Sequence, residues 1–533
     1  MLFSKTNAHL SSTNLFSSLF KDYISNSEKT QSFYKYHFSK DDFKMYLKEN
    51  TFDNVNRPAL VKALHQQANL VSNTTDATKT HIALLEQSNA YTVTTGHQLC
   101  LFTGPLYFIY KIVSTISLCK TLKLQFPDKH FVPVYWMATE DHDFEEINHA
   151  NVFGKKISWN SLQKGSVGEF STEGLQEVIT ELKTILGGSE NANALIQLFE
   201  KAYINHSNLA DATRYLVNEL FGEYGLIILD GNHAELKQLF KEEFKTDIFE
   251  NRPFKLVTDT IIELHKNYSS QVNPREINVF YKDKGIRERI EKQDDQYVVL
   301  NTSLSFSKEE LETLIEKSPE KLSPNVVLRP LYQQKILPNI TYVGGPGEIA
   351  YWLQYKTMFE DFKIHFPILM PRHFVILLDK GTQNKIQKLN LNTEDIFKDG
   401  EDLVKAFIKT EHENVNLEDA KTQLATLYQS VLQTVSEIDK SLVAATEAEK
   451  QKAINGIINI EQKINRALKQ KSETDINQIW LIKEKLFPKN TPQERYDNFS
   501  MYYIKYGSNF IPTLIDELVY DLENFEYTIL KEN

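Results

Sequence analysis

The sequence predicts an α/β protein in which a parallel, doubly wound sheet carries inserted subdomains and is accompanied by a long helical hairpin. Two observations predict this class. Short apolar runs that end in polar or glycine-rich loops alternate with helical patterns up to about residue 380, as is typical of strands buried on both faces. A heptad repeat of apolar positions appears only after residue 420 and indicates a coiled coil.

Composition excludes several classes of protein. The 533 residues carry 60 Lys and Arg against 71 Asp and Glu, and the formal net charge of −11 argues against non-specific binding to nucleic acid or anionic membranes. This net charge does not exclude local basic pockets that bind anionic substrates. Two cysteines, Cys100 and Cys119, make no disulfide framework, and neither a secretion signal nor an apolar run of ~18–20 residues is present. We therefore expect a cytoplasmic protein.

The first clear supersecondary unit is strand–helix–strand. Residues 91–95 are rich in β-branched and aromatic residues, which favours a strand. A helix is predicted from about Pro105 to Lys123, and a second strand at 131–136. Such a βαβ unit implies a parallel pair joined by a right-handed crossover.

Further strands and a division into domains follow from the same patterns. A helix is predicted at 349–359, and the other strands are predicted at 225–230, 340–343, 366–370 and 374–378. The segments 155–220 and 231–325 are too long for loops and indicate inserted subdomains. We expect a core over residues 1–385, a helical domain over 386–484 and a C-terminal segment, 485–533, that returns to the core.

The heptad seam predicts an antiparallel hairpin. It fails at Glu449 and Lys452 and resumes with a shifted phase at Ile457, which suggests a reversal of the chain between Asp439 and Lys452. The apolar positions before the shift are Leu424, Tyr428, Val431, Val435, Ile438, Leu442 and Ala445.

Three polar loops fall at predicted carboxyl ends of strands, where ligands bind in open parallel sheets. In the first loop, glycines and free N–H groups before a helix favour an anion, and His97 could hold a phosphate oxygen or move a proton. The alternative is a tight turn capped by His97, with Cys100 as a packing residue. The predicted phosphate-binding residues are Gly96, His97, Gln98, Thr103, Gly104 and Lys111.

The second loop is a dense group of acids and imidazoles. Its members suit a divalent cation or acid–base chemistry, although their spacing matches no zinc motif. The alternative is a helix N-terminus capped by Thr139, with acids in its first turn. The group comprises Glu140, Asp141, His142, Asp143, Glu145, Glu146 and His149, and we expect Asp141, His142 and Asp143 to be catalytic.

The third loop is glycine-rich but is not a Walker loop, because no Lys-Ser/Thr pair follows. Glu348 in it favours an ammonium group or ribose hydroxyls over phosphate, and a tight turn is the alternative. Two arginines beside prolines could bind carboxylate or phosphate bidentately, or could be solvated surface residues. The predicted substrate-binding residues are Arg329, Gly344, Gly345, Gly347, Glu348, Tyr351 and Arg372.

Taken together, these stretches resemble the bacillithiol biosynthesis cysteine-adding enzymes, a family of cysteine ligases. The segments that carry the resemblance are T-G-H-Q-L-C-L-F-T-G-P-L-Y-F-I-Y-K (95–111), V-P-V-Y-W-M-A-T-E-D-H-D-F-E-E-I-N-H (132–149), L-R-P-L-Y-Q-Q-K-I-L-P (328–338), Y-V-G-G-P-G-E-I-A-Y-W (342–352), M-P-R (370–372) and L-F-P-K-N-T-P-Q-E-R (486–495). His97 departs from the family pattern, which has Gln there.

The resemblance implies a Rossmann-like core with two connecting-peptide insertions and a coiled-coil arm that makes a homodimer. It also implies addition of L-cysteine to glucosaminyl malate, giving the low-molecular-weight thiol bacillithiol. Because joining a carboxylate to an amine requires an activated acyl group, we expect ATP, with Mg²⁺, as cofactor. Two other functions stay open at this stage: a metal-dependent hydrolase using the Glu140–His149 cluster, and an assembly protein that acts through its coiled coil.

Overall fold

The computed structural model describes residues 2–411 and 417–533, and the chain divides into two compact units. Residues 1–11, 15–377 and 492–533 form the first unit, and residues 12–14 and 378–491 form the second. None of the helices in the described ranges combines the length and the hydropathy needed to cross a bilayer.

The first unit is built on a five-stranded parallel sheet of strand order β13-β12-β2-β3-β6. Pairing of β2 with β3 runs without a break from Ala90↔His130 to His97↔Met137, so their carboxyl ends lie at one edge of the sheet. The predicted parallel core is confirmed. The strands are β2 (Ala90–His97), β3 (His130–Met137), β6 (Ile227–Asp230), β12 (Asn339–Gly344) and β13 (Ile368–Pro371).

Helix α5 (Tyr107–Gln125) makes the crossover between β2 and β3, as predicted. It packs against both strands on one side and against α24 (Phe510–Glu517) on the other. Because it is covered on both sides, even the Lys111 side chain in its second turn is buried.

Two predictions about the later elements are wrong. Residues 374–378 do form a strand, β14 (Val375–Leu378), but it belongs to a separate sheet of order β1-β15-β14, with β1 at Phe3–Ala8 and β15 at Tyr527–Glu532. The helix predicted at 349–359 is two helices, α15 (Pro346–Trp352) and α16 (Lys356–Asp361). The break follows from tertiary contacts, because the buried Gln354 side chain hydrogen-bonds the backbone of Gln271 and Val272.

Two long insertions follow β3 and β6. The first contains a β4–β5 hairpin (His149–Val152 and Lys155–Ser158), the short α6 (Phe144–Ile147) and three helices: α7 (Leu175–Leu186), α8 (Glu190–Tyr203) and α9 (Leu209–Phe221). The second contains α10 (Ala234–Gln238), α11 (Lys241–Glu250), α12 (Arg252–Leu264) and α13 (Lys308–Lys317). It also contains an antiparallel sheet of order β10-β9-β8-β7-β11: β7 (Val279–Asp283), β8 (Ile286–Gln293), β9 (Gln296–Val299), β10 (Ser305–Phe306) and β11 (Leu322–Pro324). Helix α14 (Leu328–Ile336) leads back to β12.

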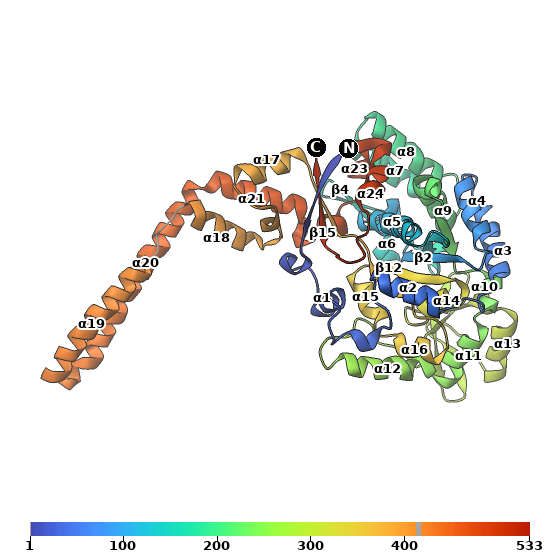
Figure 1. Cartoon of the computed structure of the whole chain (residues 1–533), viewed down its shortest axis with the longest axis horizontal. Coiled ribbons are helices and arrows are strands. Elements are labelled where there is room, and N and C mark those ends of the chain that lie inside the picture. The colour runs from blue at the N-terminus through green and yellow to red at the C-terminus, as the bar shows by residue number, and fades with distance from the viewer. Residues whose placement is uncertain (1, 412–416) are drawn as a thin grey trace. The chain divides into compact units, whose positions relative to one another are not determined.

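The aromatic C-terminal segment packs into the core of the first unit (Figure 1). Phe499, Phe510 and Ile511, around α23 (Ser500–Tyr506) and α24, share one buried cluster with Phe102 and Phe199. β15 then pairs antiparallel with β1, which places the two ends of the chain side by side.

The second unit is helical. Its long helices α19 (Glu418–Ile438) and α20 (Val443–Lys471) lie side by side as an antiparallel pair, and the Lys421 ammonium is 2.7 Å from the Glu461 carboxylate across it (Figure 1). The reversal at Asp439–Leu442 falls within the predicted window. The remaining helices are α17 (Lys380–Lys388), α18 (Gly400–Glu411) and α21 (Glu473–Leu486). Residues 412–416 of the predicted helical domain lie outside the described residues.

Candidate active site

A cavity of about 900 Å³ opens at the carboxyl edge of the parallel sheet. All three predicted loops contribute to its lining, together with β7, β8 and the residues around Asn325. This volume lies at the upper end of the about 300–1,000 Å³ typical of small-molecule sites. The cavity therefore has room for more than one small ligand.

The first and third loops meet in a closed hydrogen-bond network around Glu348. The Lys111 ammonium lies 2.7 Å from Glu348 Oε2 and also donates to the Gly96 carbonyl oxygen. Tyr342 donates to Glu348 Oε1 at 2.5 Å, and the Gly345 N–H donates to Oε2 at 2.9 Å. Both Glu348 oxygens are therefore in use, and a ligand amine would have to compete with Lys111; the predicted amine or ribose contact stays a prediction.

The Lys111 ammonium and the Glu348 carboxylate each stabilise the charged form of the other. Burial raises the pKa of the Glu348 carboxyl, but the adjacent Lys111 ammonium and the other donors outweigh it and hold the pKa below its usual value. Burial lowers the pKa of Lys111, and the Glu348 carboxylate opposes that effect. We infer that the pair is ionised and serves to place a fixed ammonium beside the Gly96 backbone.

Gly96 is needed for a close approach at this point. A Cβ there would lie 3.2 Å from the Tyr342 hydroxyl and 3.8 Å from Arg329 Nη1. Arg329, in α14, donates to Gln333 Oε1 at 3.1 Å and lies over the Trp136 and Tyr342 rings. A glycine backbone between an ammonium and a guanidinium is a surface that suits an anion.

His97 is a neutral residue of the cavity wall. Its Nδ1 lies 2.9 Å from the Gln98 carbonyl oxygen, so Nδ1 carries the proton. Burial and the Lys111 charge lower its pKa to about 3, so His97 brings no positive charge to a phosphate at neutral pH. The neighbouring Cys100 is buried, which raises the pKa of its thiol to about 12 and fits a packing residue.

Three predicted site residues lie behind the lining of the cavity. The Gly104 carbonyl accepts a hydrogen bond from Asn498, beside the buried Thr103, and the Gly344 carbonyl accepts one from the Arg372 N–H. Their roles in ligand binding stay predictions. Gln98, Gly345, Gly347 and Tyr351 do line the cavity.

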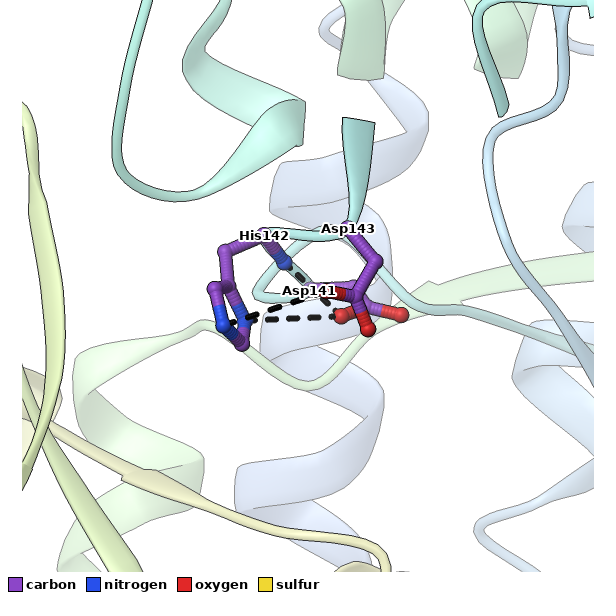
Figure 2. A group of neighbouring side chains, drawn as sticks. All are labelled: Asp141, His142 and Asp143. Atoms are coloured by element: carbon purple, nitrogen blue, oxygen red, sulfur yellow. Dashed lines mark hydrogen bonds and ion pairs between the residues drawn. The ribbon is translucent and has the colours of Figure 1, made fainter. Parts of the chain in front are cut away.

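Asp141, His142 and Asp143 of the second loop line the cavity. Figure 2 shows the three side chains grouped together. Asp141 accepts from the His142 backbone N–H and from Gln98 Nε2, each at 2.8 Å, so Gln98 joins the first loop to the second. The alternative in which Thr139 caps a helix is wrong. Thr139 donates to Asp230 at 2.5 Å, and the four-residue helix α6 begins only after Asp143.

The sequence interpretation missed the arginines that the second insertion brings to the cavity. Arg287, in β8, donates from Nη1 to His142 Nδ1 at 2.7 Å, and Arg275 and Arg289 line the same wall. Arg495, just after the helical unit in the sequence, also lines the cavity. An arginine in an antiparallel strand far from the motifs gives no sequence signal; only the position of Arg495 in one of the segments that carry the resemblance could have suggested it.

Arg372 reaches the cavity but is already paired. Its guanidinium makes a bidentate ion pair with Glu494, at 2.7 and 2.9 Å, and the two side chains are 2% and 3% exposed. The predicted contact of Arg372 with substrate stays a prediction.

The cavity is richer in cations than the chain as a whole. Its lining has seven cationic side chains (Lys111, Arg275, Arg287, Arg289, Arg329, Arg372 and Arg495) against five acidic ones (Glu140, Asp141, Asp143, Glu146 and Glu348), although the chain has a net charge of −11. Such a wall favours anionic ligands.

The second loop fits a resident metal ion poorly. One ligand atom from each of Asp141, His142 and Asp143 lies within 4.8 Å of the others. However, the permanently charged Arg287 guanidinium occupies His142 Nδ1, and both Asp141 oxygens already accept hydrogen bonds. These contacts disfavour a bound divalent cation at this loop.

The parallel sheet and its crossover helix define a Rossmann-like protein, and its cavity lies at the edge of the sheet where proteins of this class bind ligands. Residues 4–373 match the family described as "Bacillithiol biosynthesis BshC, N-terminal Rossmann-like domain", and residues 375–532 match "Bacillithiol biosynthesis BshC, C-terminal coiled-coil domain". The chain therefore belongs to the BshC family of bacillithiol biosynthesis.

Curated relatives resemble the chain over nearly its full length. The "Putative cysteine ligase BshC" of Flavobacterium johnsoniae is 44% identical over 94% of this chain and 95% of its own. The proteins of the same description from Christiangramia forsetii and Bacillus cytotoxicus are 39% and 29% identical, over 95% and 92% of this chain and 95% and 94% of theirs. A solved structure described as a "putative arginyl t-RNA synthetase" from Campylobacter jejuni covers 84% of this chain and 98% of its own, at 10% identity and a TM-score of 0.23, which supports no inference.

Proposed function

We propose that this protein joins the carboxyl group of L-cysteine to the glucosamine amine of glucosaminyl malate, the step that completes bacillithiol. The observation that carries the proposal is the single cavity at the carboxyl edge of the sheet, where a cationic wall faces a loop of carboxylates and an imidazole. The cationic wall suits phosphates and the malate carboxylates, and the acidic loop suits an attacking amine.

Amide formation in water needs an activated acyl group, and we propose ATP as its source. Gly96, Lys111 and Arg329 form the surface for the nucleotide phosphates, because their backbone and cationic groups converge on one side of the cavity. Mg²⁺ enters with the nucleotide as its counterion. The third loop, with Gly345, Gly347 and Tyr351, borders the same side and would contact the ribose or the cysteine.

The test is a reaction of the pure protein with L-cysteine, glucosaminyl malate and ATP–Mg²⁺, followed by mass spectrometry. We expect a product of the mass of bacillithiol, formed together with AMP or ADP, which distinguishes an acyl adenylate from an acyl phosphate. His142→Ala and Asp143→Ala should each lose most of the product, and Asp294→Asn, in the exposed β8–β9 turn, is the control. Absence of product with the wild-type protein contradicts the proposal.

We propose further that the protein is a homodimer joined through its helical hairpin. Two observations support the proposal. In the described residues, no side chain of α19 is buried. The hairpin also has exposed apolar side chains, those of Leu427, Val431, Ile438, Leu442 and Ile460. A second copy would cover them. Sedimentation of Leu427→Glu/Val431→Glu should give a monomer, whereas Glu437→Gln should leave the dimer intact; a wild-type monomer contradicts the proposal.

A further inference from the structure

Arg287 is held by several contacts where the second insertion meets the second loop. Its side chain is 8% exposed, its guanidinium carbon lies 4.1 Å from the centroid of the Phe280 ring, and Nε donates to Ser323 Oγ at 3.1 Å. Phe280 lies in β7, which pairs with β8, and Ser323 lies in β11, the next strand beyond β7. Nη1 then donates to His142 Nδ1 at 2.7 Å.

The chemistry of the two groups fixes which ring nitrogen of His142 carries hydrogen. Arginine has only N–H donors and keeps its charge, so Nδ1 must be the acceptor. A neutral imidazole that accepts at Nδ1 carries its hydrogen on Nε2, and an imidazolium could not make this bond at all. His142 therefore offers the cavity an N–H donor and not a lone pair.

Of the two carboxylates that flank His142, the one that remains available is Asp143. Both Asp141 oxygens accept hydrogen bonds, from Gln98 and from the His142 backbone. Among the described residues, the Asp143 carboxylate has no hydrogen-bond donor; the His142 Nε2 lies 3.9 Å away, and the Asp143 side chain is 58% exposed. One group of the loop is thus a donor and its neighbour a free acceptor.

We propose that Arg287 is a positioning residue that holds His142 as the Nε2–H tautomer, so that His142 donates to an oxygen of the activated acyl group while Asp143 accepts the proton of the attacking amine. This inference rests on the proposed function. In the step itself, the amine nitrogen forms a bond to the acyl carbon. The bond from that carbon to the phosphate oxygen breaks, and its electron pair leaves with the phosphate. The amine proton passes to Asp143.

The tautomer can be read directly on the free enzyme by ¹⁵N NMR with ¹⁵N-histidine labelling, with the His142 signals assigned by their loss in His142→Gln. We expect the Nε2 resonance in the N–H range and the Nδ1 resonance in the lone-pair range. Arg287→Met, which keeps an apolar side chain over Phe280, should give a mixture of tautomers. Arg287→Lys should keep the wild-type pattern, and Arg252→Met, outside the cavity, is the matched control.

Kinetics give the second readout. Arg287→Met should lower kcat by about 10²-fold with little change in KM for ATP, and Arg287→Lys should restore much of it. Asp143→Asn should lower kcat by about 10²–10⁴-fold, and Asp294→Asn should not. A wild-type hydrogen on Nδ1, an unchanged tautomer in Arg287→Met, or a fully active Asp143→Asn overturns the proposal. Because the tautomer is measured without substrate, it is independent of whether the wild-type protein makes bacillithiol.

Discussion

The two walls of the cavity treat charge differently. On the wall built from the core strands and the C-terminal segment, the buried cations are paired with carboxylates of the protein, Lys111 with Glu348 and Arg372 with Glu494. On the wall supplied by the second insertion, Arg287 binds an imidazole, and the nearest carboxylate to Arg289 in the described part of the chain is that of Glu291, at 3.9 Å. The most buried cations of the first wall are therefore neutralised by the protein itself, whereas the arginines of the second wall keep more of their charge available to an anion.

The largest effect should come from breaking the most buried pair of the core wall. Arg372→Met leaves Glu494 charged, buried and without its partner, so the free energy of unfolding should fall by about 3–5 kcal/mol. Denaturant unfolding measures this. The double variant Arg372→Met/Glu494→Gln should lose less, and Arg252→Met, which breaks the half-exposed pair with Asp361, should cost under about 1 kcal/mol. Equal losses of unfolding free energy for Arg372→Met and Arg252→Met would contradict the view that the buried Arg372–Glu494 pair stabilises the core wall.

Lys111→Met should be the next largest perturbation of stability. The Glu348 side chain is 22% exposed, so water can partly replace its partner and the expected loss is about 2–3 kcal/mol. Adding Glu348→Gln should recover part of the stability but none of the bacillithiol formation, because the ammonium beside Gly96 is still missing. Recovery of activity in the double variant would show that Lys111 does not contact the ligand.

His97 should make stability depend on pH below neutrality. Its pKa in the folded protein is about 3, below the ordinary value of 6.5, so the unfolded chain binds the extra proton first. The stabilisation that neutral His97 contributes to the free energy of unfolding is fully present above pH 6.5. It is lost toward pH 3 with a slope of about 1.4 kcal/mol per pH unit. Urea unfolding at pH 7, 6, 5 and 4 should show a slope for His97→Gln that is shallower by this amount. Parallel slopes would mean that the pKa of His97 is not lowered by folding.

The smallest effect on stability should come from the insertion wall. Arg275→Gln/Arg289→Gln removes charges that have no carboxylate closer than 3.9 Å among the described residues, so the free energy of unfolding should change by less than about 0.5 kcal/mol. The KM for glucosaminyl malate should rise about tenfold, which corresponds to about 1.4 kcal/mol. Added salt should raise the KM of the wild-type protein in the same way. A loss of stability without a rise in KM would make this wall structural.

The same contrast explains how much the sequence could predict. The core wall follows from local patterns: the strands of the parallel sheet, the βαβ unit and the three polar loops at strand ends were all expected, and Lys111, Glu348 and His142 do line one cavity. The helical hairpin and its turn were equally accessible, because a heptad and its phase shift are local signals.

What the sequence could not predict depends on distant partners. Arg287 meets His142 across a separation of 145 residues, and nothing in the alternation of β8 distinguishes it from a surface arginine. Strand β14 leaves the parallel sheet because Gln493 and Glu494 bind the N–H groups of Leu377 and Val375 and because β15 lies beside it. The helix that follows the third loop divides into α15 and α16 because the Gln354 side chain accepts a hydrogen bond from the Gln271 backbone N–H in the second insertion.

The pairing of Arg372 with Glu494 has a consequence for biosynthesis. The two residues are 122 positions apart, and the helical unit lies between them in the sequence. At about 5–20 residues per second, a ribosome needs roughly 6–24 s to travel that distance. During that interval the nascent core holds a guanidinium without its carboxylate and lacks the aromatic segment that completes its interior. The core wall can therefore close only after the hairpin has been translated, which makes this interval the stage at which a chaperone would be of most use.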